Sequence, residues 1–205
     1  MENFLKTLIY TLLSFFAFLT QAQDISKNEL PLFITELNAG FKPSPNGSTF
    51  GLIADISKPF YATKSGKMLW SSGLQEDFQV QLERGFEGAS GTTVRNSVDL
   101  ILGPTFYFLK SHQLSASFKI FGGWSYKTTN GKVDNSALNI NRSYSDSYHY
   151  FSRGLYLSAG YRIKQDCFFS IFYKADLRRL TNGDGIIEMP EMIYGIGVKK
   201  IIQRH

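Results

Sequence analysis

The chain has 205 residues, of which 43% are hydrophobic and 15% aromatic, and its formal net charge at pH 7 is +5. This length suits one domain, and the absence of any block of Lys and Arg argues against a protein that binds nucleic acid. The single cysteine, Cys167, excludes an internal disulfide and a cysteine-rich metal cage.

Residues 1–22 are predicted to be a cleaved signal peptide. Lys6 supplies positive charge, residues 8–19 form an apolar stretch, and Thr20-Gln21-Ala22 offers small residues around a cleavage point. The alternative is a membrane-anchoring helix, but the apolar stretch is shorter than the roughly 20 residues that a spanning helix needs. The mature chain, residues 23–205, is predicted to be one domain without a helical membrane span.

Four strands are predicted in the first half of the mature chain, because apolar and polar residues alternate there with a period of two. They cover residues 32–42, 50–57, 68–82 and 98–108, and turn-forming residues separate them at 43–47, 58–67 and 85–93. Two residues break the pattern. Glu76 falls on an apolar face, which indicates a bulge or a position near lipid headgroups, and Pro104 lacks a ladder donor, which indicates an edge strand or a bulge.

The strand with the clearest alternation covers residues 114–126, and its apolar face ends in Trp124 and Tyr126. Residues 127–148, rich in Asn, Ser, Thr and Tyr, are predicted to be the longest connection and to lie in solvent. Three further strands follow at 150–163, 168–178 and 192–202, the first two of them joined by a tight turn at 164–166.

These patterns predict an all-β fold, a closed antiparallel up-and-down transmembrane β-barrel of about eight strands. An even number of strands returns the chain to the side on which it started, and short turns alternate with longer polar connections. Strands of this length can cross a hydrocarbon layer when tilted, and Trp and Tyr at strand ends suit a lipid–water interface.

The predicted interior is charged and of mixed sign. Because an eight-stranded wall encloses a space that side chains just fill, these charges are expected to pair in a network and not to line a conduit. The residues predicted to point inward are Glu36, Asp55, Asp99, Lys119, Arg162, Lys174, Asp176, Arg178 and Lys199.

The chain resembles the small outer-membrane β-barrel proteins of Bacteroidetes-type Gram-negative bacteria, and more broadly the OmpX/OmpA-type barrel. The resemblance is carried by the roughly eight alternating strands and by two short sequences. These are Thr20-Gln21-Ala22-Gln23 at the end of the predicted signal peptide, and Leu102-Gly103-Pro104 before Phe106-Tyr107-Phe108. It implies a barrel in the cell outer membrane, in contact with its lipid, with a Gly-Pro pair inside a strand. The chain departs from the family at its end, where Gln203, Arg204 and His205 follow the last strand in place of a final aromatic residue.

No catalytic, cofactor-binding or metal-binding residue is predicted, and the chain is expected not to be an enzyme. Sequence motifs for zinc proteases, phosphate-binding loops and serine hydrolases are absent. His149 and Ser152 are the one pair worth testing, but at this spacing they should face opposite sides of a strand. Residues 182–191 partly resemble a calcium loop, yet Leu180 stands where the first Asp ligand is needed, so a hairpin turn is favoured.

Two functions follow from these patterns. The first is an integral outer-membrane barrel, not a wide pore, with a structural, adhesive or partner-binding role through its extracellular connections, above all residues 127–148. The alternative is a secreted or periplasmic soluble barrel that carries an apolar ligand, as lipocalins do, with the faces inverted. The direction of the apolar side chains decides between them.

Overall fold

The computed structural model describes residues 30–44, 47–63, 65–84, 89–108, 113–135, 140–164, 166–182 and 185–203, and the predicted signal peptide lies outside them. It is all β. The eight strands are β1 (Phe33–Ser44), β2 (Gly47–Ala62), β3 (Met68–Arg84), β4 (Ala89–Phe108), β5 (Leu114–Asn135), β6 (Ile140–Lys164), β7 (Cys167–Asn182) and β8 (Gly185–Ile202). Within this described part of the chain, no helix has the length and apolar character needed to span a membrane.

The strands form a closed barrel in chain order, and every neighbouring pair is antiparallel. Closure is made by β1 and β8, whose register runs from Phe33 opposite Ile202 to Phe41 opposite Tyr194. We call the end of the barrel with Phe33 and Ile202 the terminal end, and the opposite end the hairpin end. The predicted up-and-down barrel of eight strands is confirmed.

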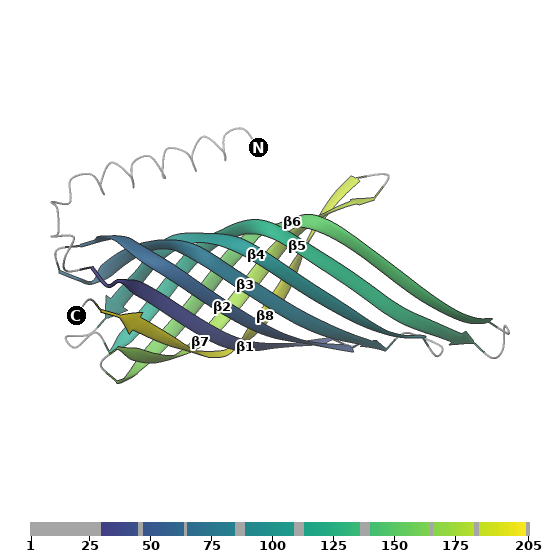
Figure 1. Cartoon of the computed structure of the whole chain (residues 1–205), viewed down its shortest axis with the longest axis horizontal. Helices are drawn as coiled ribbons and strands as arrows, with labels where there is room; N and C mark the ends of the chain where they lie inside the picture. The colour runs from purple at the N-terminus through teal and green to yellow at the C-terminus, as the bar shows by residue number, and fades with distance from the viewer. Residues whose placement is uncertain are drawn as a thin grey trace.

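The strands are strongly staggered around the barrel. A path of register partners that starts at Ile34 runs through Ser57, Gly73, Ile101, Phe121, Gly154 and Asp176 to Glu191. In the pairing of β8 with β1, Tyr194 lies opposite Phe41. Glu191 comes three residues before Tyr194, so the path returns to β1 near Ser44 and not at Ile34, where it started. Such a stagger requires strands tilted against the barrel axis, typically by about 35–45°, and Figure 1 shows this tilt.

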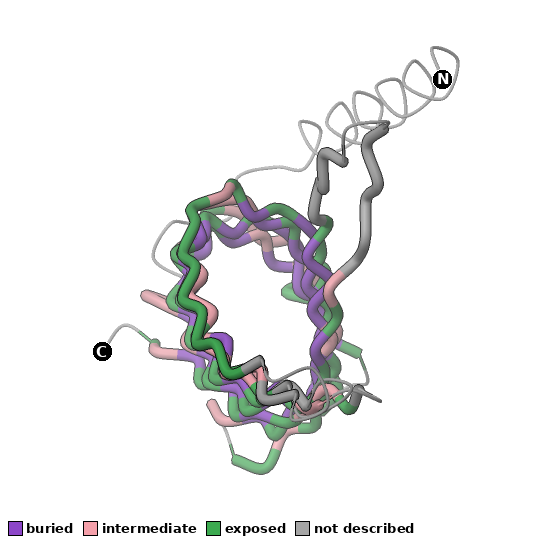
Figure 2. The backbone as a smooth tube through the Cα atoms, turned by 90° about the vertical axis from the view of Figure 1, so that its right-hand side faces the viewer, coloured by how far each residue is buried: buried purple, intermediate pink, exposed green. Residues whose placement is uncertain are grey.

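The barrel wall has an apolar outside and a polar inside. Along β2 the residues alternate between buried and exposed from Thr49 to Phe60, and the view down the barrel shows the same alternation around the ring (Figure 2). Phe118, Ile120, Leu157 and Ile171 are 39 to 57% exposed. The predicted direction of the apolar side chains is therefore confirmed.

Two apolar clusters and two ionic networks fill the interior. One cluster closes the terminal end, where its members come from the first or last residues of their strands: Ile34, Leu69, Tyr107, Phe168 and Ile201. The other lies at mid-strand and consists of Ile53, Ile101, Phe121, Tyr156, Phe172 and Ile193.

The strands are longer than predicted, and they extend into three predicted connections. β2 continues to Ala62, β4 begins at Ala89, and residues 127–135 and 140–148 belong to β5 and β6. In these segments the backbone ladder continues although the apolar alternation does not, because residues outside an apolar layer need no apolar face. The prediction that residues 127–148 form a long connection was wrong, because most of them are strand. Residues 141–149 are nevertheless exposed, as predicted.

The two irregular residues have different outcomes. Glu76 is exposed on the outward face, and the register of β3 continues through it without a bulge. It pairs with Val98, which pairs with Trp124, so it lies in the row of the interface aromatic residue. Pro104 is buried in a strand with neighbours on both sides, and the pairing of β4 with β5 is interrupted at Gly103 and Pro104 without a change of register. The expected edge or bulge at Pro104 was wrong.

Candidate functional site: the interior, the long hairpin and the outward face of β4 to β6

An ionic network fills the barrel toward its hairpin end. The ammonium of Lys174 lies 2.8 Å from a carboxylate oxygen of Asp77 and 3.0 Å from one of Asp99. The guanidinium of Arg95 lies 2.5 Å from Asp176 and 3.1 Å from Glu191. All of these side chains except Glu191 are at most 3% exposed, so the network forms a rigid polar core.

A second network lies nearer the terminal end. Lys119 donates to Asp55 at 3.0 Å, and the ammonium of Lys199 lies 3.6 Å from Glu36. The Tyr156 hydroxyl donates to Glu36 at 2.8 Å and accepts from the Asn38 amide at 2.9 Å. Each buried charge here has an opposite charge beside it, as the predicted paired network requires.

The filled interior decides against the soluble carrier. A barrel that carries an apolar ligand needs an apolar cavity, whereas the described inward positions hold mainly polar and charged residues, and the large apolar side chains lie mainly at outward positions. The lipocalin-like alternative is therefore wrong for this chain.

The structure separates the residues that the sequence singled out. His149 is exposed, and its ring lies tilted against the Tyr126 ring, with ring centroids 4.8 Å apart, whereas Ser152 is buried and donates to Asp99 on the inside. The two therefore face opposite sides of β6. Of the calcium-loop segment, residues 185–191 form part of β8, and its carboxylate Glu191 pairs with Arg95. Residues 183 and 184 lie outside the described residues, as do His112 and His205.

β5 and β6 extend beyond the other strands as a long hairpin. Their pairing continues without a shift from Leu114 opposite Tyr161 to Asn135 opposite Ile140, and Figure 1 shows the hairpin as the longest projection of the molecule. The β7–β8 hairpin diverges from it. The described pairing between β6 and β7 begins only at Gly154 opposite Asp176, so residues 140–153 of β6 pair with β5 alone.

A packed aromatic residue stabilises the outer part of this hairpin. Gly91, Gly131 and Tyr144 are register partners on three neighbouring strands. A Cβ atom placed on Gly131 would overlap the Tyr144 ring, and one placed on Gly91 would lie 3.2 Å from the Tyr144 hydroxyl. The ring therefore covers both glycines, an arrangement that compensates for the missing side chains in a sheet.

The outward face of β4 to β6 changes in character from the barrel toward the tip. In the first aromatic row, Trp124 and Phe151 meet edge to face with centroids 6.1 Å apart. Next along the strands comes the Tyr126–His149 pair, whose rings are tilted against each other. Beyond it the face is hydrophilic, with Asn130 between Thr92 and Ser145, and Lys132 between Ser90 and Ser143.

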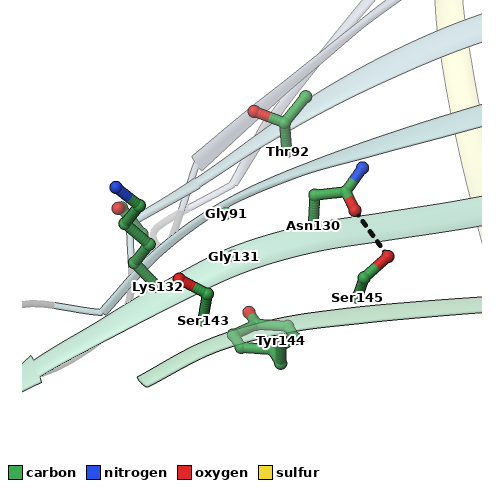
Figure 3. Close-up of a pocket in the computed structure, with 9 residues that line it drawn as sticks. Gly91, Thr92, Asn130, Gly131, Lys132, Ser143, Tyr144 and Ser145 are labelled. Atoms are coloured by element: carbon green, nitrogen blue, oxygen red, sulfur yellow. Dashed lines mark hydrogen bonds between the residues drawn. The ribbon is translucent and has the colours of Figure 1, made fainter. Parts of the chain in front are cut away.

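These six hydrophilic residues line an open hollow of about 530 Å³, and the close-up in Figure 3 shows it. Its floor includes the backbone of Gly91 and Gly131. The Ser145 hydroxyl donates to the side-chain oxygen of Asn130 at 2.7 Å, so two of the lining groups are already oriented. Hydroxyl, amide and ammonium groups on a shallow surface suit a hydrophilic ligand.

The interior networks contain three charged residues that the sequence analysis did not place inside, Asp77, Arg95 and Glu191. Asp77 alternates with outward residues of the third predicted strand and could have been found from that pattern. Arg95 lies before the predicted start of the fourth strand, where no apolar alternation marks it. The unpaired edge of β6 had no sequence signal.

Comparison with known proteins gives only distant similarities. No family profile and no curated protein matches the chain. The solved structures that resemble it include Neisserial surface protein A (TM-score 0.43, 11% identity, covering 83% of this chain and 95% of that one). Others are the attachment invasion locus protein Ail of Yersinia pestis (0.38, 15%, 82% and 95%) and the N-terminal β-barrel domain of Pseudomonas aeruginosa OprF (0.39, 11%, 84% and 98%). The barrel assignment itself follows from the strand order and registers of this chain.

Proposed function

We propose that the mature chain, residues 23–205, is an integral outer-membrane β-barrel without enzymatic activity, and that its hairpin end binds an extended segment of an extracellular partner. The apolar outward face supports the membrane location, because a closed barrel satisfies its backbone groups internally and can expose apolar side chains to lipid. The filled interior supports a structural, adhesive or partner-binding role, because it offers no wide pore.

The observation that carries the partner-binding role is the unpaired edge of β6. The backbone nitrogen of Arg153 points toward β7, where it meets an Asp176 oxygen at 3.3 Å, whereas the backbone nitrogen of Arg162 donates to Gln113 beside β5. Alternate residues of a strand direct their backbone groups to the same edge. Asn141, Ser143, Ser145, Ser147, His149 and Phe151 therefore present their N–H and C=O groups to the open edge.

An open edge of this length is a template for strand addition. Backbone hydrogen bonds to an added strand supply affinity, and pockets for alternate side chains supply specificity. The exposed residues along this edge are mostly Ser, Asn and Tyr, which are adaptable or amphipathic contact residues in binding surfaces. An extended peptide segment is therefore the partner chemistry that fits.

The membrane location is tested by refolding the purified protein into detergent micelles and into lipid vesicles. A membrane barrel should give a β-type circular dichroism spectrum and a different gel mobility when heated and unheated. Recovery of a folded monomer in aqueous buffer without detergent would contradict the proposal.

The open edge is tested with proline substitutions that act only on its donors. Ser145→Pro and Ser147→Pro each remove an N–H group that points away from β5, and proline is tolerated on such an edge. Peptides selected from a displayed library on the wild-type barrel should lose at least about tenfold in affinity on these variants, which corresponds to about 1.4 kcal/mol. Ser145→Ala and Ser147→Ala remove the side chain but keep the donor, and they should bind as the wild type does. Equal loss in the alanine variants would show that side chains, not the edge, bind the partner.

A further inference from the structure

The open edge of β6 lacks the features that keep exposed strand edges from pairing with one another. Native proteins protect such edges with proline, lysine, bulges or very short strands. Residues 140–153 contain no proline and no lysine, and their register with β5 runs without a shift. The edge is therefore regular, and an antiparallel strand can pair along it.

The side chains along this edge are complementary to a second copy of themselves. Arg142, Tyr144 and Asp146 lie on one face of β6, because alternate residues share a face, and all three are exposed. The buried Ser152 lies on the same face, which is thus the face directed to the inside of the barrel. The two charges have opposite sign and stand symmetrically about Tyr144. A second copy of the segment, turned end for end, therefore offers each charge its opposite.

One antiparallel register of two such edges brings these groups together. When Tyr144 lies opposite Tyr144 of the second copy, Arg142 lies opposite Asp146 on both sides of the two-fold axis. A register centred on Arg142 or on Asp146 would put like charges opposite each other, which is destabilising. In the favoured register, residues whose backbone groups point to the open edge meet in hydrogen-bonded pairs. These pairs are Ser143 with Ser145 and Asn141 with Ser147.

Neither the Tyr144 ring nor β7 obstructs this pairing. The ring lies over β5, because a Cβ atom placed on Gly131 would overlap it. The described pairing of β6 with β7 begins only at Gly154, and Figure 1 shows that the β7–β8 hairpin diverges from the β5–β6 hairpin. A second hairpin can therefore extend along the edge past Tyr148 before it meets β7.

The pairing places the two barrels at opposite ends of one sheet. A two-fold axis relates the copies in such a dimer, and for antiparallel strands this axis stands perpendicular to the sheet. The hairpin continues the barrel wall along the barrel (Figure 1), so the two-fold axis is also perpendicular to the barrel axis. Two copies in one membrane point the same way and cannot meet this condition, whereas two copies in facing membranes can.

We propose that the β6 edge pairs with the same edge of a second copy in a facing membrane, so that the protein joins two membrane surfaces through a shared sheet. This pairing rests on the proposed function, and it names the extracellular partner as residues 141–147 of the same protein. A single contact of this kind is short, but many copies on both surfaces act together and strengthen the junction.

The charge pairs are tested with lipid vesicles that each carry one purified variant, and light scattering measures how far the vesicles cluster. Wild-type vesicles should cluster. Vesicles with Arg142→Asp alone or Asp146→Arg alone should cluster at least about tenfold less, because like charges then lie opposite each other. A mixture of the two variant populations should cluster as the wild type does, because each aspartate again meets an arginine. Lys132→Asp makes the same charge change on β5 and should cluster as the wild type does.

The rescue in the mixture separates a lost charge pair from a misfolded variant. A heat-dependent gel shift of each variant shows that it is inserted and folded. Folded variants whose mixture does not cluster, or variant vesicles that cluster as well alone as the wild type, would overturn the paired register.

The register and the arrangement across two membranes are tested by oxidation of single cysteines in the Cys167→Ser background. Tyr144→Cys places a thiol opposite its counterpart, with Cα atoms about 4.5 Å apart in a non-hydrogen-bonded pair, a separation that a disulfide can span. Tyr148→Cys places the two thiols far apart along the sheet and should form no disulfide. When tagged and untagged Tyr144→Cys proteins are inserted in separate vesicles and then mixed, tagged–untagged dimers should form. Dimers within one population only, or equal dimer formation by Tyr148→Cys, would overturn the pairing.

The outcomes separate this pairing from the proposed function. Failure of the wild type to insert, seen as the absence of a heat-dependent gel shift, would contradict the membrane location. Inserted barrels that bind library peptides at the β6 edge, but whose vesicles do not cluster, would contradict the pairing alone. Clustering that Ser145→Pro leaves unchanged would place the contact outside the edge and overturn the pairing as well.

Discussion

At the scale of single residues, the interior depends on charges that are buried together. Lys174 is 1% exposed and lies between Asp77 and Asp99, both fully buried. Attraction offsets the cost of burying these groups only while all partners are present, because removal of one leaves an uncompensated charge. The network therefore makes the folded barrel sensitive to the loss of one ammonium group.

We predict that Lys174→Met destabilises the barrel by about 3–5 kcal/mol, the usual cost of breaking a buried ion pair. Denaturant unfolding in detergent micelles, followed by tryptophan fluorescence, measures this change. Lys200→Met, at an exposed position, should change the free energy of unfolding by less than about 0.5 kcal/mol. The triple variant with Asp77→Asn and Asp99→Asn should recover part of the loss, and a single variant as stable as the wild type would show that the pairs contribute nothing.

The inward residues were largely predictable from the sequence. Glu36, Asp55, Asp99, Lys119, Lys174, Asp176 and Lys199 are buried as expected, because a period-two strand assigns each residue to one face. Arg162 is half-buried and its guanidinium lies 5.1 Å from the centre of the Phe168 ring. The side chain of Arg178 lies outside the described residues. The pairing of these charges could not be predicted, since each partner comes from a different strand.

At the scale of elements, the β5–β6 hairpin projects from the barrel because the pairing of β6 with β5 continues to the tip, whereas the pairing of β6 with β7 stops earlier. Thr93 and Thr129 hydrogen-bond at 3.0 Å across β4 and β5, and Tyr144 covers the two glycines nearer the tip. The hairpin is therefore an ordered three-strand extension with β4, although its sequence reads as a polar connection. Alternation of hydropathy predicts a strand only where one face of it meets an apolar environment.

We predict that Gly131→Val loosens the hairpin tip, because its Cβ takes the place of the Tyr144 ring. The expected cost is about 0.5–1 kcal/mol, the size of one cross-strand aromatic contact. Hydrogen exchange of the amides in residues 127–148 measures it, and the exchange of the barrel amides should not change. In the Tyr144→Ala background the same valine should cost nothing further, and an equal cost in both backgrounds would show that the ring and the glycine do not interact.

At the scale of the whole molecule, the barrel is a filled cylinder. The apolar cluster around Phe168 closes its terminal end, and the two ionic networks occupy the space above it. A pore would need a continuous row of hydrated positions, and a lining of one sign would select ions. The described interior has both signs in direct contact.

We predict that the protein inserted in a planar lipid bilayer shows no steady ion conductance. Single-channel recording measures this, with a wide outer-membrane pore as a positive control for insertion. Stepwise conductance of the wild type that scales with the number of inserted barrels would contradict the filled interior.

The sequence by itself determined the number of strands and the division of residues in the predicted strands between two faces, because both follow from local alternation and turn residues. Only the tertiary structure decided whether the apolar face of each strand points outward to lipid or inward to a ligand. A strand with a period of two has an apolar face and a polar face, but its sequence does not show which of them becomes the inside of the barrel. Tertiary structure also decided the stagger, the ion pairs and the open edge of β6. Each of these depends on which residues of distant segments stand opposite one another, and no single segment contains that information.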